Sequence, residues 1–343
     1  ITIQNSNLVC GGGVQVGNKF TRCYGGNHGT LGVRRAIHVS CDGYFYRLGL
    51  KMGLDGIMEM VDEFDLNKRS GIDLPNEKIS WTPSRELKKR FNPRNPEWKD
   101  IDTVYASFGQ ATDIMTPISM LRAEAAVGIG GKLYVPHLLK EIRAVGKSGT
   151  PDHRPAKVFA HPEPKIIPIP EDQHRLVVDG MWDVVNTPGG TGYGIKMAGF
   201  DIAGKTGTAQ VVSRGKEGKN NKDHSWFVSF APAYKPEVSI ISIIENVGFG
   251  GRFSGPAVRA VYDVYYRKTR GEEPPGALVA QLKTKPEDGL RLAAAQAKPN
   301  PAEATAAKIA RANGGKPSDT TRKQNPQQQE SKPGGNTSPK KPT

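Results

Sequence analysis

The sequence lacks the long apolar segment that a membrane-spanning helix requires. No apolar run approaches the roughly 20 residues that cross a bilayer, and no signal peptide is visible. The sequence also lacks an initiator methionine, because it begins with Ile1. We therefore expect a piece of a longer product, with any export or anchoring segment outside these 343 residues.

Aromatic residues are scarce, at 7% of the chain, although the formal net charge is +14. A basic surface suits an anionic envelope or polymer. Nucleic-acid modules place aromatic and basic residues in recognisable patterns, and no such pattern is present, so we expect no nucleic-acid partner. The glycine-rich stretch 189–194 lacks the Lys-Ser/Thr ending of a phosphate-binding loop, which argues against nucleotide binding.

Cysteine is rarer still, and all three cysteines lie near the start, at Cys10, Cys23 and Cys41, with His28 between them. Three thiols and one imidazole are the ligand set of a closed structural zinc site. The Gly/Asn-rich segment around them cannot build its own core, which favours a metal. Because the spacing is not that of a common zinc finger, a disulfide plus an odd thiol and three unrelated cysteines stay open as alternatives.

The most informative stretch is 204–210, Gly-Lys-Thr-Gly-Thr-Ala-Gln, which follows an apolar run typical of a strand. Lys-Thr-Gly on a strand is a signature of serine acyl-transfer enzymes that react with penicillin. Lys205 and Thr206 would offer a positive charge and a hydroxyl to a substrate carboxylate. Gly207 would let a substrate backbone lie along the strand edge. A surface turn with these letters by chance is the alternative.

A second candidate pair is Ser40 and Asp42, two residues apart at the break between two helical patterns. Both side chains can point into one cleft at such a corner. Ser and Asp are also common helix N-caps, and the two roles are compatible.

The remaining pattern is α+β: helices first, then two or three antiparallel strands, then a closing helix. The last helix is expected to turn Ala257, Val261, Val264 and Tyr265 inward. We expect a folded domain over 1–270 and a disordered Ala/Pro/Lys/Gln-rich tail over 271–343, with a short helix possible at 302–312. Helices are predicted at 58–64, 116–128, 171–185 and 254–267, a short strand within 133–142, a hairpin of 228–230 with 238–245, and surface connections at 67–98 and 151–170.

Together these motifs resemble the transpeptidase domain of class B penicillin-binding proteins, most closely the elongation type called penicillin-binding protein 2. They occur in the family's order and cover nearly everything from Cys10 to Arg270. The matching pieces are His28-Gly-Thr-Leu31, Ser40-Cys-Asp-Gly-Tyr-Phe-Tyr46, Ser70-Gly-Ile-Asp-Leu74, Ser107-Phe-Gly-Gln110, Thr116-Pro-Ile118, Ala203-Gly-Lys-Thr-Gly-Thr-Ala-Gln210, Asp223-His224 and Phe230-Ala-Pro232.

The resemblance implies a serine β-lactamase/transpeptidase-like fold and a D,D-transpeptidase that cross-links peptidoglycan stem peptides, reacts with β-lactams and serves cell elongation and cell shape. Ser40 and Asp42 match the second motif, with Asp42 where many relatives have Asn. Lys205, Thr206 and Gly207 match the third, and Thr208 would contribute its backbone to the oxyanion hole. A glycosyltransferase of the elongation machinery is the implied partner, and the inner membrane with a periplasmic catalytic domain is the implied location.

The elongation type is also similar in having a zinc site near its second motif, where its His and final Cys match His28 and Cys41. Some members use Asp where this chain has Cys10 and Cys23, and zinc accepts thiolates well. The metal would then brace the corner that aims Ser40 and Asp42.

The chain departs from the family at the nucleophile, which lies in a Ser-x-x-Lys motif ahead of the second motif. No such motif precedes Ser40, and Ser213-Arg-Gly-Lys216 follows the Lys205 strand, the wrong place. We therefore expect the fold to be incomplete at its N-terminus and the chain alone to form no acyl-enzyme. A degenerate or sensor-type penicillin-binding domain, a β-lactamase and a zinc-stapled interaction module are the alternatives.

Overall fold

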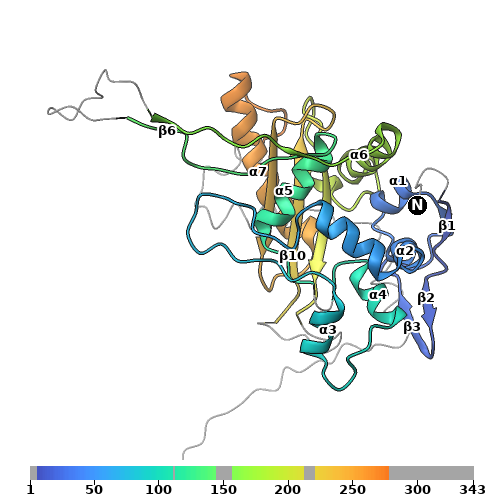
Figure 1. Cartoon of the computed structure of the whole chain (residues 1–343). Coiled ribbons are helices and arrows are strands. Elements are labelled where there is room, and N and C mark those ends of the chain that lie inside the picture. Colours follow the sequence, from blue (N-terminus) through green and yellow to red (C-terminus); the bar gives the residue numbers. More distant parts are fainter. Residues whose placement is uncertain (1–5, 111–112, 144–156, 212–220, 278–343) are drawn as a thin grey trace, which may run out of the picture.

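The computed structural model describes residues 6–110, 113–143, 157–211 and 221–277 (Figure 1). The helices in these residues are α1 (Val33–His38), α2 (Asp42–Glu63), α3 (Arg85–Phe91), α4 (Asp100–Ala106), α5 (Pro117–Gly128), α6 (Glu171–Asn186) and α7 (Gly250–Arg270), with a 3-10 turn at Tyr193–Ile195. The strands are β1 (Leu8–Val9), β2 (Gly13–Val16), β3 (Lys19–Arg22), β4 (Thr30–Leu31), β5 (Lys132–Leu133), β6 (Glu141–Ile142), β7 (Lys157–Val158), β8 (Lys165–Ile166), β9 (Ala203–Ala209), β10 (His224–Ala231) and β11 (Val238–Ile244). None of these helices combines the length and hydrophobicity needed to span a bilayer.

An antiparallel sheet in the order β11-β10-β9 forms the centre of the fold (Figure 1). Lys205 of β9 lies opposite Val228 of β10, which in turn lies opposite Ile241 of β11. Among the described residues β9 pairs only with β10, so its other edge has no strand partner. The expected hairpin of β10 and β11 is confirmed.

Helices cover both faces of this sheet. On one face the Tyr262 hydroxyl of α7 donates to Ser229 Oγ of β10 at 3.0 Å. On the other face, a Cβ added to Gly128 of α5 would lie only 3.0 Å from the ring of Phe230, so the small residue lets helix and sheet meet. Phe230 is fully buried and belongs to the main core. The α+β class is therefore confirmed.

The closing helix is confirmed, but its predicted inward face is only partly right, because Tyr265 packs against the main core whereas Val261 and Val264 do not. Val261 and Val264 are 51% and 36% exposed. The buried side repeats every fourth residue and is largely polar or aromatic, which the search for aliphatic residues overlooked. This side consists of Ser254, Val258, Tyr262 and Tyr266.

The first two helices form a tight corner. The Cys41 amide donates to Ala36 O at 2.9 Å, and α2 begins one residue later. The helix predicted at 58–64 is the second half of α2, beyond a kink at Gly53, whose φ of 69° is left-handed. Helix α1 packs on α6, where Gly180 lies against Ile37.

Most remaining predictions are confirmed with adjusted bounds, including α5 and α6. The strand expected within 133–142 is divided into β5, which pairs with β8, and β6, which pairs with β7. Pro136 lies between them and has no N–H to donate, which accounts for the break. Residues 278–343, including the possible helix at 302–312, lie outside the described residues. The segment after α7 packs back on the helix, because Arg259 donates hydrogen bonds to the carbonyls of Pro275 and Gly276.

Candidate active site and metal centre

The two motifs that lie 165 residues apart meet at one hydrogen bond. Lys205 Nζ on β9 donates to Ser40 Oγ at the α1–α2 corner over 2.9 Å. It also donates to Thr206 O at 2.7 Å. The second motif and the Lys-Thr-Gly strand are therefore brought together as the sequence analysis expected.

Ser40 has a strained backbone. Its φ of 52° is left-handed, a conformation that costs a residue with a Cβ of the order of 1–2 kcal/mol. Its amide donates to Ile37 O at 3.1 Å, which fixes it at the end of α1. Strain of this kind collects where a side chain must be aimed. Ser40 is not the N-cap of α2, because that position is Cys41 and no side-chain cap bond is present there.

Asp42 is the first residue of α2, and its side chain binds a different group from the one that binds Ser40. Its Oδ2 accepts a hydrogen bond from the backbone N–H of Tyr24 at 2.8 Å. Tyr24 follows Cys23, so Asp42 joins the cysteine-bearing loop to the corner that carries Ser40. Its negative charge also acts on Lys205 and raises the pKa of that ammonium.

Lys205 is a largely enclosed cation. Burial lowers its pKa from 10.5 to about 8, because a low-dielectric surrounding disfavours the charged form. The carboxylates of Asp42 and Glu124 act in the opposite direction and favour the ammonium. The amine can therefore change its protonation state close to neutral pH.

The other residues of the strand motif are placed as follows. The Thr206 hydroxyl donates to the Thr191 hydroxyl at 2.7 Å. The backbone of Gly207 lies against the first residue of α7, since a Cβ added to Gly250 would clash with Gly207 O. The carbonyl of Thr208 accepts from Gln110 Nε2 at 3.2 Å. Both Thr191 and Gln110 were missed as site residues, although Gln110 ends one of the matching motifs.

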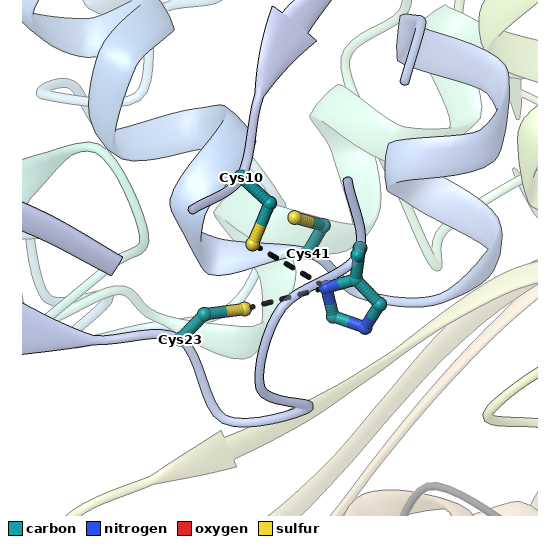
Figure 2. A group of neighbouring side chains, drawn as sticks. Cys10, Cys23 and Cys41 are labelled. Atoms are coloured by element: carbon teal, nitrogen blue, oxygen red, sulfur yellow. Dashed lines mark hydrogen bonds between the residues drawn. The ribbon is translucent and has the colours of Figure 1, made fainter. Parts of the chain in front are cut away.

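The four expected metal ligands lie together, although their elements are separate in the sequence. Their ligand atoms all fall within 4.8 Å of one another. Cys10 Sγ and Cys23 Sγ each lie 3.6 Å from His28 Nδ1. Figure 2 shows the cysteine side chains pointing toward one another, with dashed lines from two of them to the ring nitrogen. Cys41, the last residue before α2, completes the set.

This geometry fits a tetrahedral zinc site. Zn–S and Zn–N bonds of about 2.3 and 2.0 Å at tetrahedral angles place S and N roughly 3.5 Å apart. All three cysteines are buried and carry free thiols in the structure. Two glycines leave room for the cluster. A Cβ on Gly25 would lie 2.5 Å from His28 Nε2, and a Cβ on Gly43 would lie 2.8 Å from Cys10 Sγ.

The thiols also perturb one another electrostatically. Hydrogen bonding from Cys41, together with His28, lowers the pKa of the Cys23 thiol to about 3. The contact with Cys23 raises the pKa of His28 to about 9, and it also raises the pKa of Cys41. Such crowding of proton-bearing groups in a buried pocket is the arrangement that metal binding relieves.

The sequence offers no nucleophile motif at this site. Ser213–Lys216 lies outside the described residues, and a second Ser-x-x-Lys, Ser338–Lys341, also lies outside them. Nothing in the structure therefore bears on either motif.

Comparison with known proteins identifies the family. A model of the penicillin binding protein transpeptidase domain matches residues 2–263. The chain belongs to this transpeptidase family. It is 35% identical over 256 residues to the peptidoglycan D,D-transpeptidase MrdA of Acinetobacter baumannii, covering 72% of this chain and 36% of that protein. It is 36% identical over 246 residues to MrdA of Salmonella typhimurium, covering 69% and 38%. The chain thus spans little more than a third of these relatives.

Solved structures confirm the penicillin-binding transpeptidase fold. The chain resembles Pseudomonas aeruginosa PBP2 in complex with WCK 5153, with a TM-score of 0.65, 28% identity and coverage of 78% of this chain and 57% of that one. It also resembles the PBP2 of a complex with MreC from Helicobacter pylori, with a TM-score of 0.61, 27% identity and coverage of 77% and 46%.

Proposed function

We propose that the protein carrying this chain is a peptidoglycan D,D-transpeptidase of the elongation type. The observation that carries the proposal is the 2.9 Å contact between Lys205 Nζ and Ser40 Oγ beside the open edge of β9. A peptide lying along the strand would present its carboxylate and its reacting amide to this cation and hydroxyl. Family membership and the MrdA relatives support the same reaction.

In the proposed reaction a serine of the family's Ser-x-x-Lys motif attacks the penultimate D-Ala carbonyl of a stem peptide. The amide C–N bond breaks, the terminal D-Ala leaves with a proton on its amine, and an amine of a second stem takes the acyl group. A β-lactam enters the same first step, but its amide is in a ring, so the leaving amine stays attached.

The roles assigned to this chain follow from its hydrogen bonds. Because Lys205 donates to Ser40 Oγ, the Ser40 hydroxyl keeps its own proton for the departing amine. Lys205 supplies positive charge to the substrate carboxylate, assisted by the Thr206–Thr191 hydroxyl pair. Asp42 holds the corner through Tyr24, and the Thr208 backbone stabilises the oxyanion.

We further propose that Cys10, Cys23, His28 and Cys41 hold a structural zinc ion. Four protein ligands close the coordination shell, so the ion would brace the fold and take no part in the acyl transfer. The bond from Asp42 to Tyr24 N would transmit this bracing from the metal loop to Ser40, since Cys41 lies between the two site residues.

Partners and location follow from the same proposal. The elongation-type relatives include a PBP2 solved with MreC. We propose a peptidoglycan glycosyltransferase of the elongation machinery as the partner, and a periplasmic catalytic domain attached to the inner membrane as the location. Co-purification of the natural-length protein from detergent-solubilised membranes tests both; recovery from the soluble fraction without a glycosyltransferase contradicts them.

Labelling with a fluorescent penicillin tests the function. The experiment compares this chain with the natural-length protein, and a chromogenic cephalosporin measures turnover. We expect a stable acyl-enzyme on the natural-length protein, no label on this chain, and cross-linking of stem peptides by the labelled form.

The other outcomes separate the alternatives. Rapid hydrolysis of the cephalosporin identifies a β-lactamase. Label without cross-linking identifies a sensor-type domain. Absence of label on the folded natural-length protein contradicts the proposed function outright, and label on this chain would show that a serine within it is the nucleophile.

A further inference from the structure

A carboxylate outside the recognised motifs lies on the same face of the sheet as Lys205. Lys205 is opposite Val228, and Phe230 is two residues further along β10, so all three point to one face. Gly128 of α5 contacts the ring of Phe230, which places α5 over that face. Glu124 lies one helical turn before Gly128 and therefore follows the same side of α5.

Glu124 is buried at its charged end without the contacts that normally accompany burial. Its Oε1 is enclosed and has no hydrogen-bond partner among the described residues. A buried carboxylate without partners is costly, so a neighbouring cation is the expected compensation. Burial raises its pKa to about 7, and the positive charge of Lys205 acts against that rise.

The ammonium of Lys205 can accommodate a further hydrogen-bond acceptor or counter-charge. An ammonium has three protons, and Ser40 Oγ and Thr206 O accept two of them. Two carboxylates act on its charge, Asp42 from α2 and Glu124 from α5. Asp42 is already engaged by the amide of Tyr24, whereas Glu124 Oε1 is not engaged.

Three other ionisable groups on the helices that pack against the sheet have partners of their own. Asp183 of α6 accepts from Arg34 at 2.6 Å. His174, also of α6, meets the Val127 carbonyl at 2.7 Å through Nε2. On the opposite face, Tyr262 of α7 donates to Ser229.

We propose that Glu124 is a positioning residue whose carboxylate is the buried counter-charge of Lys205, holding it as an ammonium directed at Ser40. The proposal rests on the transpeptidase function for its consequence in acylation, but the electrostatic relation itself does not depend on that function. Removing the carboxylate makes Lys205 lose its proton at lower pH, and the enzyme then loses its site cation within the neutral range.

The test compares Glu124→Gln, which removes the charge at constant shape, with Glu124→Asp, which keeps it. Glu171→Gln, at the exposed start of α6, is the matched control. Two readouts are taken on the natural-length protein between pH 6 and 10. One is the rate of penicillin acylation. The other is competitive acetylation with mass spectrometry, which reports the neutral fraction of the Lys205 amine whether or not the protein acylates.

In Glu124→Gln we expect the Lys205 titration and the alkaline fall of acylation to move together to lower pH by about one unit, as loss of a close opposite charge predicts. Glu124→Asp, which keeps the charge, should show little of this shift, and Glu171→Gln should show none. Superimposable Lys205 titrations in wild type and Glu124→Gln overturn the proposal.

A folding defect and a failed function are both distinguishable from that result. If Glu124→Gln does not fold, Glu124→Met fills the site without a polar group and gives the same two readouts. A wild type that never reacts with penicillin sinks the transpeptidase proposal, while the acetylation titration still decides the role of Glu124.

Discussion

Lys205 Nζ lies 2.9 Å from Ser40 Oγ, and this one hydrogen bond connects the edge strand β9 to the α1–α2 corner. The amine is mostly enclosed, whereas the serine has a left-handed backbone that aims its hydroxyl. A cation and an oriented hydroxyl thereby share one site, although the residues are far apart in the chain.

Removing this cation tests its role. We expect Lys205→Ala in the natural-length protein to reduce penicillin acylation by about 100-fold or more, as loss of a proton-transfer and charge-binding group does. Lys205→Arg should not restore the rate, because a guanidinium cannot replace a compact ammonium in an enclosed site. Lys235→Ala, an exposed lysine between β10 and β11, is the control. Unchanged labelling of Lys205→Ala contradicts the assigned role.

The hydroxyl and the backbone strain of Ser40 can be separated. Both Ser40→Ala and Ser40→Gly remove the hydroxyl, so both should lower acylation by about 100-fold. Glycine accepts the φ of 52° freely, so Ser40→Gly should unfold with a free energy about 1 kcal/mol higher than Ser40→Ala. Urea unfolding measures the difference. Equal stability would show that the conformation costs nothing here.

The pH dependence of acylation follows from the pKa of Lys205. Below its pKa of about 8 the amine is an ammonium, and above that value it is neutral. The proposed function needs the ammonium, so the acylation rate should fall as pH rises through about 8. An ordinary exposed lysine would retain its charge to beyond pH 10. A rate that stays level up to pH 10 would show that the charge is not needed.

The cysteine cluster predicts a measurable metal content. Mass spectrometry of the purified protein should find one zinc per chain, and Cys23→Ser should lower that content and the thermal midpoint together. His161→Ala, outside the cluster, is the matched control and should retain the metal. A wild type that binds no zinc when purified with zinc present ends this proposal.

Breaking the buried ion pair of α7 should lower the stability of the fold strongly without affecting the acylation reaction directly. Arg259 and Asp263 are 5% and 0% exposed and lie 2.8 Å apart. Asp263→Ala leaves a guanidinium buried without its carboxylate and should cost about 3–5 kcal/mol of unfolding free energy. Glu273→Ala removes the exposed partner of Arg267 and should cost at most about 1 kcal/mol. Similar losses in both variants would contradict the distinction.

Local signals in the sequence were sufficient for several elements. Thr116 followed by Pro117 predicted the start of α5, and the Thr116 side chain does cap it by accepting from the Ser119 amide. The alternation around Val228 and Val238 predicted the hairpin. The four metal ligands could be named because thiols and imidazoles are rare in this chain and have few structural uses.

Other features depended on packing and gave no such signal. The periodicity of α7 allowed more than one inward face, and the aliphatic choice of Val261 and Val264 lost to a side that buries Tyr262 and the Arg259–Asp263 pair. Residue type alone did not reveal that these polar groups would find partners on β10 and within the helix.

The sequence by itself therefore determined the family, the motif residues and the order of the elements, because each depends on residue types and on short spacings along the chain. Tertiary structure alone decided that Lys205 meets Ser40, that Asp42 binds the amide of Tyr24, and that the helix carrying Glu124 packs on the sheet face of Lys205. These relations join segments from different helices and strands, and only the packing of those elements brings such segments within hydrogen-bonding or electrostatic range.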